Sequence, residues 1–292
     1  MLDLPKSVVF CKKCLVSNQK PNSTVEIKSD ISKKKSTQYF DNNGICVACN
    51  YSELKKNKID WEKREKELLS LLEKYRKYNG DYDCIVPGSG GKDSCYVSHL
   101  LKYKYKMNPL TVTWAPHEFT KIGQQNFNSW LNSGFDNIFI TPNRGVHRKL
   151  TKYSFLNLLH PFQPFIVGQK MTAPKIALKY KIPLIFYGEN PAEYGNNLDD
   201  NYNPLMDIKY FTTEKKEKEN FFLSGYSKAE LINNKIMTEN DFNFYSPIVR
   251  DEVIDLDLKV YYMSYFLKWD PQDNYFYAAT NCGFRPAEQR TI

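Results

Sequence analysis

The segment from Asp81 to Leu101, "DYDCIVPGSGGKDSCYVSHLL", decides the fold of this chain. It opens with an apolar run, Cys84–Pro87, that has the length and boundaries of a short buried strand. The glycine-rich loop Gly88–Gly91 comes next, and apolar residues then recur at roughly helical spacing. We expect Asp93 or Ser94 to cap that helix. The segment therefore predicts a strand, a tight glycine loop and a helix N-terminus in succession.

This succession suits an anion. A helix N-terminus presents free N–H groups and the positive end of the helix dipole, and glycines let a ligand approach the backbone. The spacing is wrong for a Walker A loop and for G-x-G-x-x-G, so a dinucleotide fold has little support. The alternative is a glycine-rich turn in an ordinary α/β domain. The predicted phosphate site consists of Gly88, Ser89, Gly90, Gly91, Lys92, Asp93 and Ser94.

The stretch "SGGKDS", Ser89–Ser94, resembles the pyrophosphate-binding loop S-G-G-x-D-S of the PP-loop ATP pyrophosphatases. In that family the loop grips the β- and γ-phosphates of ATP, AMP passes to a carbonyl oxygen, and ammonia or a sulfur donor attacks the adenylated carbon. The resemblance implies that ATP is the ligand, that Mg²⁺ bridges its phosphates and that Lys92 neutralises phosphate charge. Asp93 would organise the metal or the loop, with a helix cap as the alternative. Ser94 would be a phosphate ligand rather than a nucleophile.

Two C-x-x-C pairs, "CKKC" and "CVAC", lie near the N-terminus, and their thiols are Cys11, Cys14, Cys46 and Cys49. In a chain without a secretion signal such pairs favour a metal over disulfides, and four thiolates suit a structural Zn²⁺. The gap between the pairs exceeds the usual ribbon spacing, and we attribute the excess to a loop insertion, "KSDISKKKSTQ". The alternatives are unliganded cysteines and an iron–sulfur cluster.

The composition bounds the class of protein. The 292 residues can bury a sizeable core, as one large domain or as a small one plus a large one. No run of about 18 apolar residues occurs and the N-terminus lacks the apolar core of a signal peptide, so we expect a cytoplasmic chain without membrane insertion. Residues 1–80 hold 17 Lys and Arg against 10 Asp and Glu, and so carry +7 of the formal +8. A solvated lysine-rich surface explains this better than a nucleic acid partner, which we do not expect.

The pattern divides the chain into a zinc-ribbon-like module (1–56), a connecting amphipathic helix (57–80) and a PP-loop ATP pyrophosphatase domain (81–292). In the third part we expect strands in "PLTVTWA", "DNIFIT" and "IPLIFYG", and helices over 119–132, 146–159 and 165–180. The alternation predicts an α/β fold, a parallel sheet with helices on both faces. The resemblance further implies the adenine nucleotide alpha hydrolase-like form of that fold.

Ligands of such sheets bind at the carboxyl ends of the strands. We therefore expect the phosphate loop, Trp114-Ala115-Pro116 and Gly188-Glu189-Asn190 to meet at one edge. Trp114 would cover adenine, with core packing as the alternative, and Gly188 would join the ATP site. Glu189 and Glu193 would hold Mg²⁺ or orient an incoming amine, although acidic loops are usually only solvated.

Six further segments extend the resemblance over most of the chain: "IGQQNFNSWLNSGFDN", "TPNRGVHRKL", "PFIVGQK", "FYGENPAEYG", "KWDP" and "NCGFRP". With the paired C-x-x-C knuckles they resemble the N-acetyl sugar amidotransferases, PP-loop enzymes of bacterial surface-sugar and lipopolysaccharide biosynthesis. Family members convert an N-acetyl group into an acetamidino group, on nonulosonic acids such as pseudaminic or legionaminic acid and on nucleotide-linked amino sugars. They continue past the end of this sequence, so the resemblance implies a further C-terminal segment.

Further residues and partners complete the predicted site. As the nearest polar groups, Glu189 and Asn190 would assist the attack of ammonia, and Lys170 of "GQK" would be a second cation near the substrate, with a surface lysine as the alternative. His147 and Arg148 of "GVHRKL" would contact the acetamido sugar, with structural or surface roles as the alternatives. No glutaminase pattern is readable, so ammonia would come from solution or from a separate glutaminase with a cyclase-like subunit.

The main alternative is a PP-loop tRNA thiolase. Such enzymes generally need extra cysteines near the ATP site to carry sulfur, and only Cys95 and Cys282 follow the loop. We interpret Cys84 and Cys95 as core thiols. A third class, a nucleotide-binding zinc adaptor without activity, is disfavoured by the intact Lys-Asp-Ser sequence of the loop.

Overall fold

A computed structural model of the chain describes residues 4–29, 32, 36–194 and 203–287. Its centre is a sheet of five parallel strands in the order β3-β2-β1-β4-β9. The strands are β1 (Cys84–Pro87), β2 (Pro109–Trp114), β3 (Asn137–Ile140), β4 (Leu184–Tyr187) and β9 (Lys259–Tyr262). The expected fold class is confirmed, and β9 is an additional strand that the sequence analysis did not predict.

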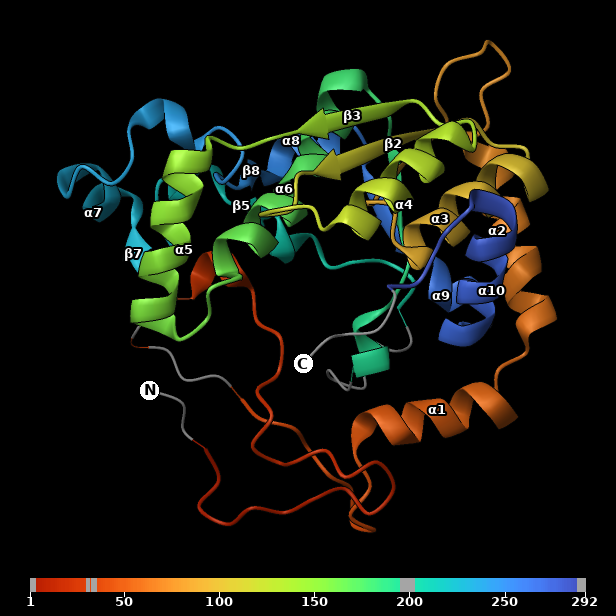
Figure 1. Cartoon of the computed structure of the whole chain (residues 1–292), viewed down its shortest axis with the longest axis horizontal. Helices are drawn as coiled ribbons and strands as arrows, with labels where there is room; N and C mark the ends of the chain where they lie inside the picture. Colours follow the sequence, from red (N-terminus) through yellow and green to blue (C-terminus); the bar gives the residue numbers. More distant parts are fainter. Residues whose placement is uncertain (1–3, 30–31, 33–35, 195–202, 288–292) are drawn as a thin grey trace.

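Helices cover both faces of this sheet (Figure 1). On one face α6 packs against Ile85 and Ile185; on the other, α2 and α3 pack against Cys84 and Val86. A strand that is buried on both sides has a continuous run of apolar residues in its sequence, which is why β1 and β4 were predictable. The α-helices are α1 (Val47–Asn57), α2 (Trp61–Tyr75), α3 (Lys92–His99), α4 (Lys121–Asn132), α5 (Arg144–Leu158), α6 (Gln163–Tyr180), α7 (Lys228–Asn233), α8 (Arg250–Asp255), α9 (Met263–Phe266) and α10 (Pro271–Cys282).

Shorter elements fill the region between β4 and β9. Two small sheets pair β5 (Thr212–Thr213) with β8 (Ile248–Val249) in parallel, and β6 (Phe222–Leu223) with β7 (Tyr226–Ser227) in antiparallel fashion. The same region contains the short helical turns η3 (Pro191–Tyr194), η5 (Ile208–Tyr210), η6 (Lys215–Glu217) and η7 (Glu239–Phe242). Two further short elements precede β4, namely η1 (Glu26–Lys28) and the π-helical η2 (Leu100–Lys104). Within the described ranges, no helix has the length and apolarity that crossing a membrane requires.

The strand order creates a switch point between β1 and β4. From β1 the chain proceeds outward through β2 to β3, whereas β4 and then β9 extend the sheet in the opposite direction. At such a point the loops that follow the two central strands diverge and leave a crevice for a ligand. The loops concerned are Gly88–Gly91 after β1 and Gly188–Asn190 after β4.

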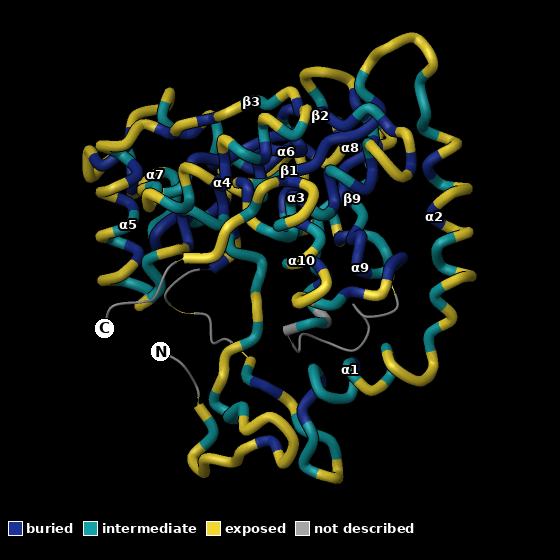
Figure 2. Tube along the Cα trace, turned by 45° about the vertical axis from the view of Figure 1, so that its right-hand side comes forward, coloured by how far each residue is buried: buried dark blue, intermediate teal, exposed yellow. Residues whose placement is uncertain are grey.

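The N-terminal part lies below the sheet, and α1 runs across the bottom of the molecule (Figure 1). Much of this part is exposed or half-buried, in contrast to the sheet (Figure 2). Isolated bridges, Phe10 with Ser17 and Phe40 with Cys46, hold its two cysteine loops, as expected of a ribbon-like module. Helix α2 follows, and its fully buried Leu68 and Leu72 attach it to the core, so the expected amphipathic helix is present.

Candidate functional site

The glycine loop places the start of α3 at the carboxyl end of β1. Gly88 donates its N–H to the carbonyl of Val112 in β2, which continues the sheet by one bond. Gly90 has φ +80°, and a Cβ there would lie 2.6 Å from Cα of Phe127 in α4. Gly91 is the N-cap of α3, and a Cβ on it would meet no atom within 4 Å. The loop thus packs against α4 on one side and is open on the side of the helix N-terminus.

The expected cap by Asp93 or Ser94 is wrong, because α3 begins at Lys92 and its N-cap, Gly91, has no side chain to make a cap bond. Ser94 Oγ instead donates to the carbonyl of Gly91 at 2.9 Å. The N–H groups of the first helical turn have no partners within a helix. A cap without a side chain leaves their side of the loop accessible to an anion.

Lys92 and Asp93 form a close pair at this helix end. Lys92 Nζ lies 2.7 Å from both carboxylate oxygens of Asp93, and Asn274 of α10 donates to Asp93 Oδ1 at 3.2 Å. Both members of the pair are about one third exposed, 28% and 32%, so either can turn toward a ligand. The cation and the carboxylate predicted for the phosphate site are therefore adjacent.

The segment after β4 meets this loop. A Cβ at Gly188 would lie 3.6 Å from Cβ of Asp93, which shows how closely the two loops approach. Ser264, just after β9, fixes the segment by donating its N–H to the Gly188 carbonyl and by accepting from the N–H of the buried Asn190 at 2.8 Å. Helix α9, which directly follows the unforeseen strand β9, therefore holds the Gly188–Asn190 segment in place.

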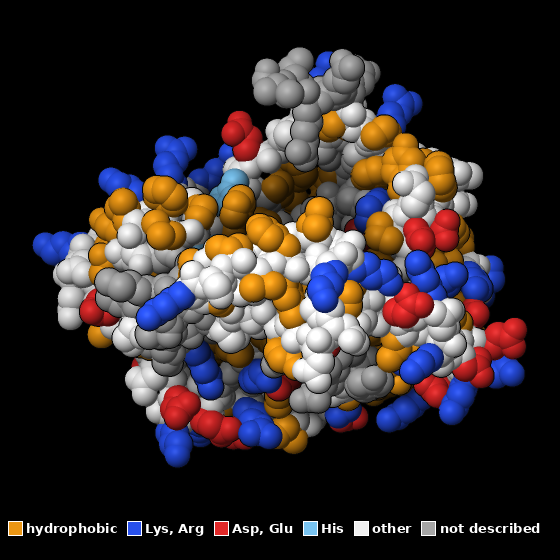
Figure 3. All heavy atoms as spheres, turned by 90° about the horizontal axis from the view of Figure 1, so that it is seen from below, with side chains coloured by type: hydrophobic (Ala, Val, Ile, Leu, Met, Phe, Trp, Pro, Cys, Tyr) orange, Lys and Arg blue, Asp and Glu red, His pale blue; other side chains and the backbone are white. Residues whose placement is uncertain are grey.

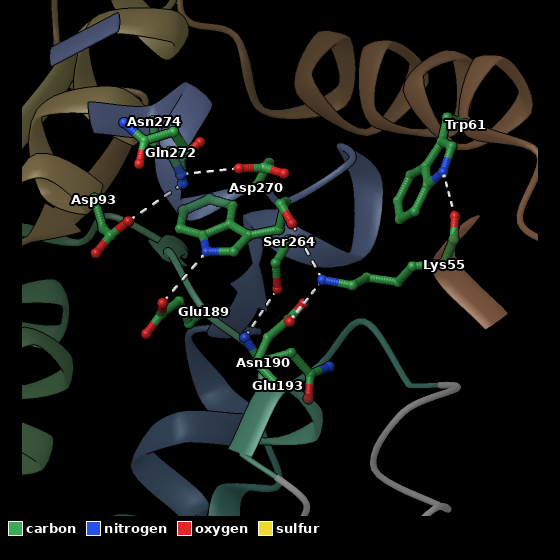
Figure 4. A network of polar contacts seen from close by, with 11 residues as sticks. Lys55, Trp61, Asp93, Glu189, Asn190, Glu193, Ser264, Asp270, Gln272 and Asn274 are labelled. Carbon is green, nitrogen blue, oxygen red and sulfur yellow. Dashed lines mark hydrogen bonds and ion pairs between the residues drawn. The ribbon is translucent and has the colours of Figure 1, made fainter. Parts of the chain in front are cut away.

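Trp269 connects this segment to the C-terminal helices. Its side chain is 2% exposed, and a Cβ at Gly188 would lie only 3.0 Å from its ring. Trp269 Nε1 donates to Glu189 Oε1 at 3.4 Å, a long bond (Figure 4). Sequence reasoning gave Trp269 no role; its only signal was the segment "KWDP" within the family resemblance.

Glu193 lies one turn beyond Glu189 and faces α1. Its Oε2 accepts from Lys55 Nζ at 2.6 Å, and its side chain is 15% exposed. Burial raises the pKa of the Glu193 carboxyl above its ordinary value of 4.5, although Lys55 opposes the shift. Glu193 is thus engaged by the N-terminal part, whereas Glu189 is bonded to Trp269 (Figure 4).

Trp114 ends β2 at the expected edge, but its side chain is only 5% exposed. A Cβ at Gly168 of α6 would overlap the ring, at 2.2 Å from Cζ2, and His147 and Tyr245 pack against the ring edge-on. This burial favours the alternative, core packing, and a role in covering adenine stays a prediction. His147 is also buried and its Nδ1 bonds the Tyr245 hydroxyl at 2.7 Å, while Arg148 is exposed on α5.

Lys170 lies at the same sheet edge on the face covered by α6. Its Nζ is 5.0 Å from the centre of the Tyr187 ring, at the end of β4. Burial lowers the pKa of Lys170 to about 8, and no carboxylate of a described residue pairs with it. The face seen in Figure 3 is hollowed, with hydrophobic side chains in the walls of the hollow.

The four N-terminal thiols converge. Sγ of Cys14 and Cys46 are 3.6 Å apart, those of Cys11 and Cys49 are 4.0 Å apart, and all four lie within 4.8 Å of one another. A tetrahedral ion with metal–sulfur bonds of about 2.3 Å would place them roughly 3.8 Å apart. Burial alone would raise the pKa of the Cys11 thiol, but backbone N–H groups lower it to about 6, which favours the thiolate. The cluster therefore fits a single metal ion.

Cys95 and Cys282 also come together, which the sequence did not reveal. Cys95 follows the phosphate loop in α3, and Cys282 ends α10; Cys282 Sγ lies 3.8 Å from the Cys95 carbonyl oxygen. The two side chains are 1% and 3% exposed, so both are core thiols; this was expected for Cys95.

Comparisons with known proteins place few constraints on this chain. No family model matches it. An 81-residue stretch is 41% identical to an uncharacterized protein of Methanocaldococcus jannaschii, and the match covers 28% of this chain and 28% of that protein. The chain thus spans well under a third of that relative.

Three solved structures with some similarity to the chain are distant from it in sequence. A U34-tRNA thiolase from Methanococcus maripaludis with its [4Fe-4S] cluster has a TM-score of 0.36 and 14% identity, over 96% of this chain and 74% of that one. NMN synthetase from Francisella tularensis has a TM-score of 0.34 and 12% identity, over 80% and 100%. NH3-dependent NAD synthetase from Campylobacter jejuni has a TM-score of 0.35 and 14% identity, over 80% and 100%. Scores of this size assign no activity to the chain.

Proposed function

We propose that this chain is a PP-loop ATP pyrophosphatase that adenylates the N-acetyl oxygen of an acetamido sugar and then replaces that oxygen with ammonia nitrogen. One observation carries the proposal. The open N-terminus of α3, with Lys92 and Asp93, meets the Gly188–Asn190 segment at the switch point of a parallel sheet. This is where an α/β sheet binds its ligand, and the groups present suit a polyphosphate.

The groups at this loop can support the first step. The α3 N-terminus and Lys92 would hold the β- and γ-phosphates, while the carbonyl oxygen attacks the α-phosphorus and the bond to pyrophosphate breaks. In phosphoryl and adenylyl transfer, most of the rate acceleration comes from positioning the two reactants and neutralising the phosphate charge. Asp93 and Glu189 would be the carboxylates that hold Mg²⁺, which when bound would neutralise phosphate charge.

The second step needs a base near the activated carbon. Ammonia would attack the imidate-like carbon, a C–N bond forms, the C–O bond to AMP breaks, and a proton is released. Glu189 is partly exposed and directly follows Gly188, which approaches Asp93, so its carboxylate could orient ammonia and accept that proton. Such general-base catalysis typically accelerates a step by about 10²–10⁴-fold. Asn190 is buried and held by Ser264, so it would shape the segment around Glu189.

The substrate class rests on the family resemblance. An acetamido sugar such as a nonulosonic acid is the candidate, with ammonia from solution or from a separate glutaminase and cyclase-like subunit. Lys170, His147 and Arg148 remain candidates for the substrate side. Zn²⁺ held by the four N-terminal thiolates would stabilise the fold, because a set of four protein ligands leaves no position for a substrate.

The test is an activity screen followed by one variant. Candidate acetamido sugars are incubated with ATP, Mg²⁺ and ammonium, and AMP release is measured. If no sugar causes AMP release, the substrate class is rejected. Glu189→Gln should keep sugar-dependent pyrophosphate exchange and lose most amidine product at saturating ammonium. Equal loss of both activities would assign Glu189 to Mg²⁺, and loss of neither would make it an ordinary loop carboxylate.

A tRNA thiolase remains the second candidate, and the approach of Cys95 to Cys282 beside the loop is the observation in its favour. Against it, a thiol that carries sulfur must be accessible to its donor, and these are 1% and 3% exposed. Co-purification of tRNA, together with loss of activity in Cys95→Ser, would favour the thiolase.

A further inference from the structure

Helix α1 brings one lysine of the N-terminal part into the site network. Lys55 Nζ donates to Glu193 Oε2 at 2.6 Å and to the carbonyl oxygen of Trp269 at 3.1 Å (Figure 4). The side chains of Lys55 and Glu193 are 12% and 15% exposed, so the pair is largely removed from water. Removal of either partner would leave the other as a buried, unpaired charge, which proteins tolerate poorly.

Both acceptors of Lys55 belong to residues that contact the Gly188–Asn190 segment. Trp269 lies against Gly188 and donates to Glu189, and Glu193 donates its N–H to the Asn190 carbonyl at 3.0 Å. Lys55 therefore joins the two supports of this segment, one from η3 and one from the chain before α10.

The helix that carries Lys55 is itself anchored at both ends. It starts directly after Cys46 and contains Cys49, two of the four converging thiols. At its other end, Trp61 Nε1 donates to the Lys55 carbonyl at 3.1 Å, and Tyr51, 2% exposed, packs below the ammonium with 5.6 Å from Nζ to the ring centre. The lysine therefore has little freedom to move away from Glu193.

We propose that Lys55 is a positioning residue for amination: it holds Glu193 and Trp269 so that Glu189 stays directed at the activated carbon. The inference rests on the proposed function, and it adds a contribution of the N-terminal part to the chemistry. Lys55 touches neither ATP nor sugar in this role. It acts through the segment that both of its acceptors support.

The first test separates positioning from general stability. Lys55→Met should lose about 10–100-fold in amidine formation at saturating ammonium, the range for residues that orient catalytic groups, and keep sugar-dependent pyrophosphate exchange within about twofold. Lys55→Arg should restore part of the loss, and Lys56→Met, an exposed lysine of the same helix, should behave like the parent. Equal loss of exchange and product, or a Lys55→Met protein as active as Lys56→Met, would overturn the inference.

The second test does not depend on any activity. Hydrogen exchange followed by mass spectrometry should show at least tenfold faster exchange in residues 187–194 of Lys55→Met, where the amides of Asn190 and Glu193 are bonded, and no change in residues 88–95. Glu193→Gln should show the same pattern, which keeps the inference testable if Lys55→Met does not fold. If no sugar supports turnover by the parent protein, the proposed function fails. Unchanged hydrogen exchange in residues 187–194 of the variants would separately reject the role of Lys55.

Discussion

Two neighbouring glycines of the phosphate loop should fail in opposite ways when they are replaced by alanine. Gly90 has φ +80°, and its Cβ would lie 2.6 Å from the backbone of Phe127, whereas a Cβ on Gly91 would meet nothing within 4 Å. Gly90 is therefore needed for the shape of the loop. We expect Gly91 to be needed for the space that a phosphate occupies.

The magnitudes follow from these contacts. In Gly90→Ala the left-handed backbone costs roughly 1–2 kcal/mol and the overlap with α4 roughly 1–3 kcal/mol, together about 2–5 kcal/mol. At about 2 °C per kcal/mol for a chain of this size, the Tm should fall by about 4–10 °C. Gly80→Ala is the matched control, because Gly80 has φ +87° with no atom near its Cβ, and should cost only about 1–2 kcal/mol.

Gly91→Ala should leave stability nearly unchanged. Alanine is a poorer N-cap than glycine by up to about 1 kcal/mol, but it also restricts the unfolded chain, which returns about 0.4–1 kcal/mol. The new methyl group would occupy the open side of the loop. Loss of one charge-assisted hydrogen bond to phosphate, about 1.5–3 kcal/mol, corresponds to roughly 10–100-fold weaker nucleotide binding.

The assay pairs thermal unfolding with calorimetric titration of a non-hydrolysable ATP analogue and Mg²⁺. Gly91→Ala should keep the parent Tm and bind the ATP analogue more weakly. Gly90→Ala should show a lower Tm than the parent. Parent affinity in Gly91→Ala would show that the open side of the loop is not the phosphate site. A parent Tm in Gly90→Ala would refute the packing of the loop against α4.

Three further predictions follow from single residues. Lys92→Ala should weaken ATP-analogue binding and slow AMP release, because its ammonium lies at the α3 N-terminus beside Asp93; AMP release at the parent rate would remove Lys92 from the site. Cys46→Ser should reduce bound metal from about one ion per chain to a trace by elemental analysis, while the ATP analogue still binds; no zinc in the parent protein, or iron with sulfide, would contradict the assignment of zinc. Burial lowers the pKa of Lys170 to about 8, and its side chain can bind an anion only as the ammonium. We therefore expect kcat/KM to fall as the pH rises through about 8, and Lys170→Arg to remove that decline. An unchanged pH profile in the arginine variant would exclude Lys170 from the site.

The parts of the fold that sequence could predict are those with local signals. Cys84–Pro87 and Leu184–Tyr187 are apolar runs bounded by turns, and the glycine loop between β1 and α3 has its own composition. Strand β9 was missed because "KVYY" is only four residues long, is separated from α8 by only the short turn 256–258, and runs directly into α9. Its place beside β4 is decided by tertiary packing, which outweighs local preference.

The site residues that sequence missed lie far from the loops they support. Ser264 and Trp269 reach the Gly188–Asn190 segment across about 75–80 positions, and Lys55 reaches Glu193 across 138. Asn274 bonds Asp93 across 181 positions. Nothing in the spacing of a serine, tryptophan or lysine marks such a contact, since it depends on how β9 and α1 pack. Residues that contact ligands form local motifs, whereas residues that hold those motifs in place do not.

Under the proposed role of Lys55, the N-terminal part would contribute to catalysis. It has few buried apolar side chains of its own, among them Ile27, Val47 and Tyr51, and such small units usually need a metal to fold. Metal bound to Cys46 and Cys49 would fix the start of α1, and α1 delivers Lys55 to Glu193. Removal of the metal should therefore disturb the position of Glu189 through α1. Helix α3 and its phosphate loop, which pack on the main sheet, should keep their structure. A closed four-thiolate site can in this way be required for amination without ever contacting a substrate.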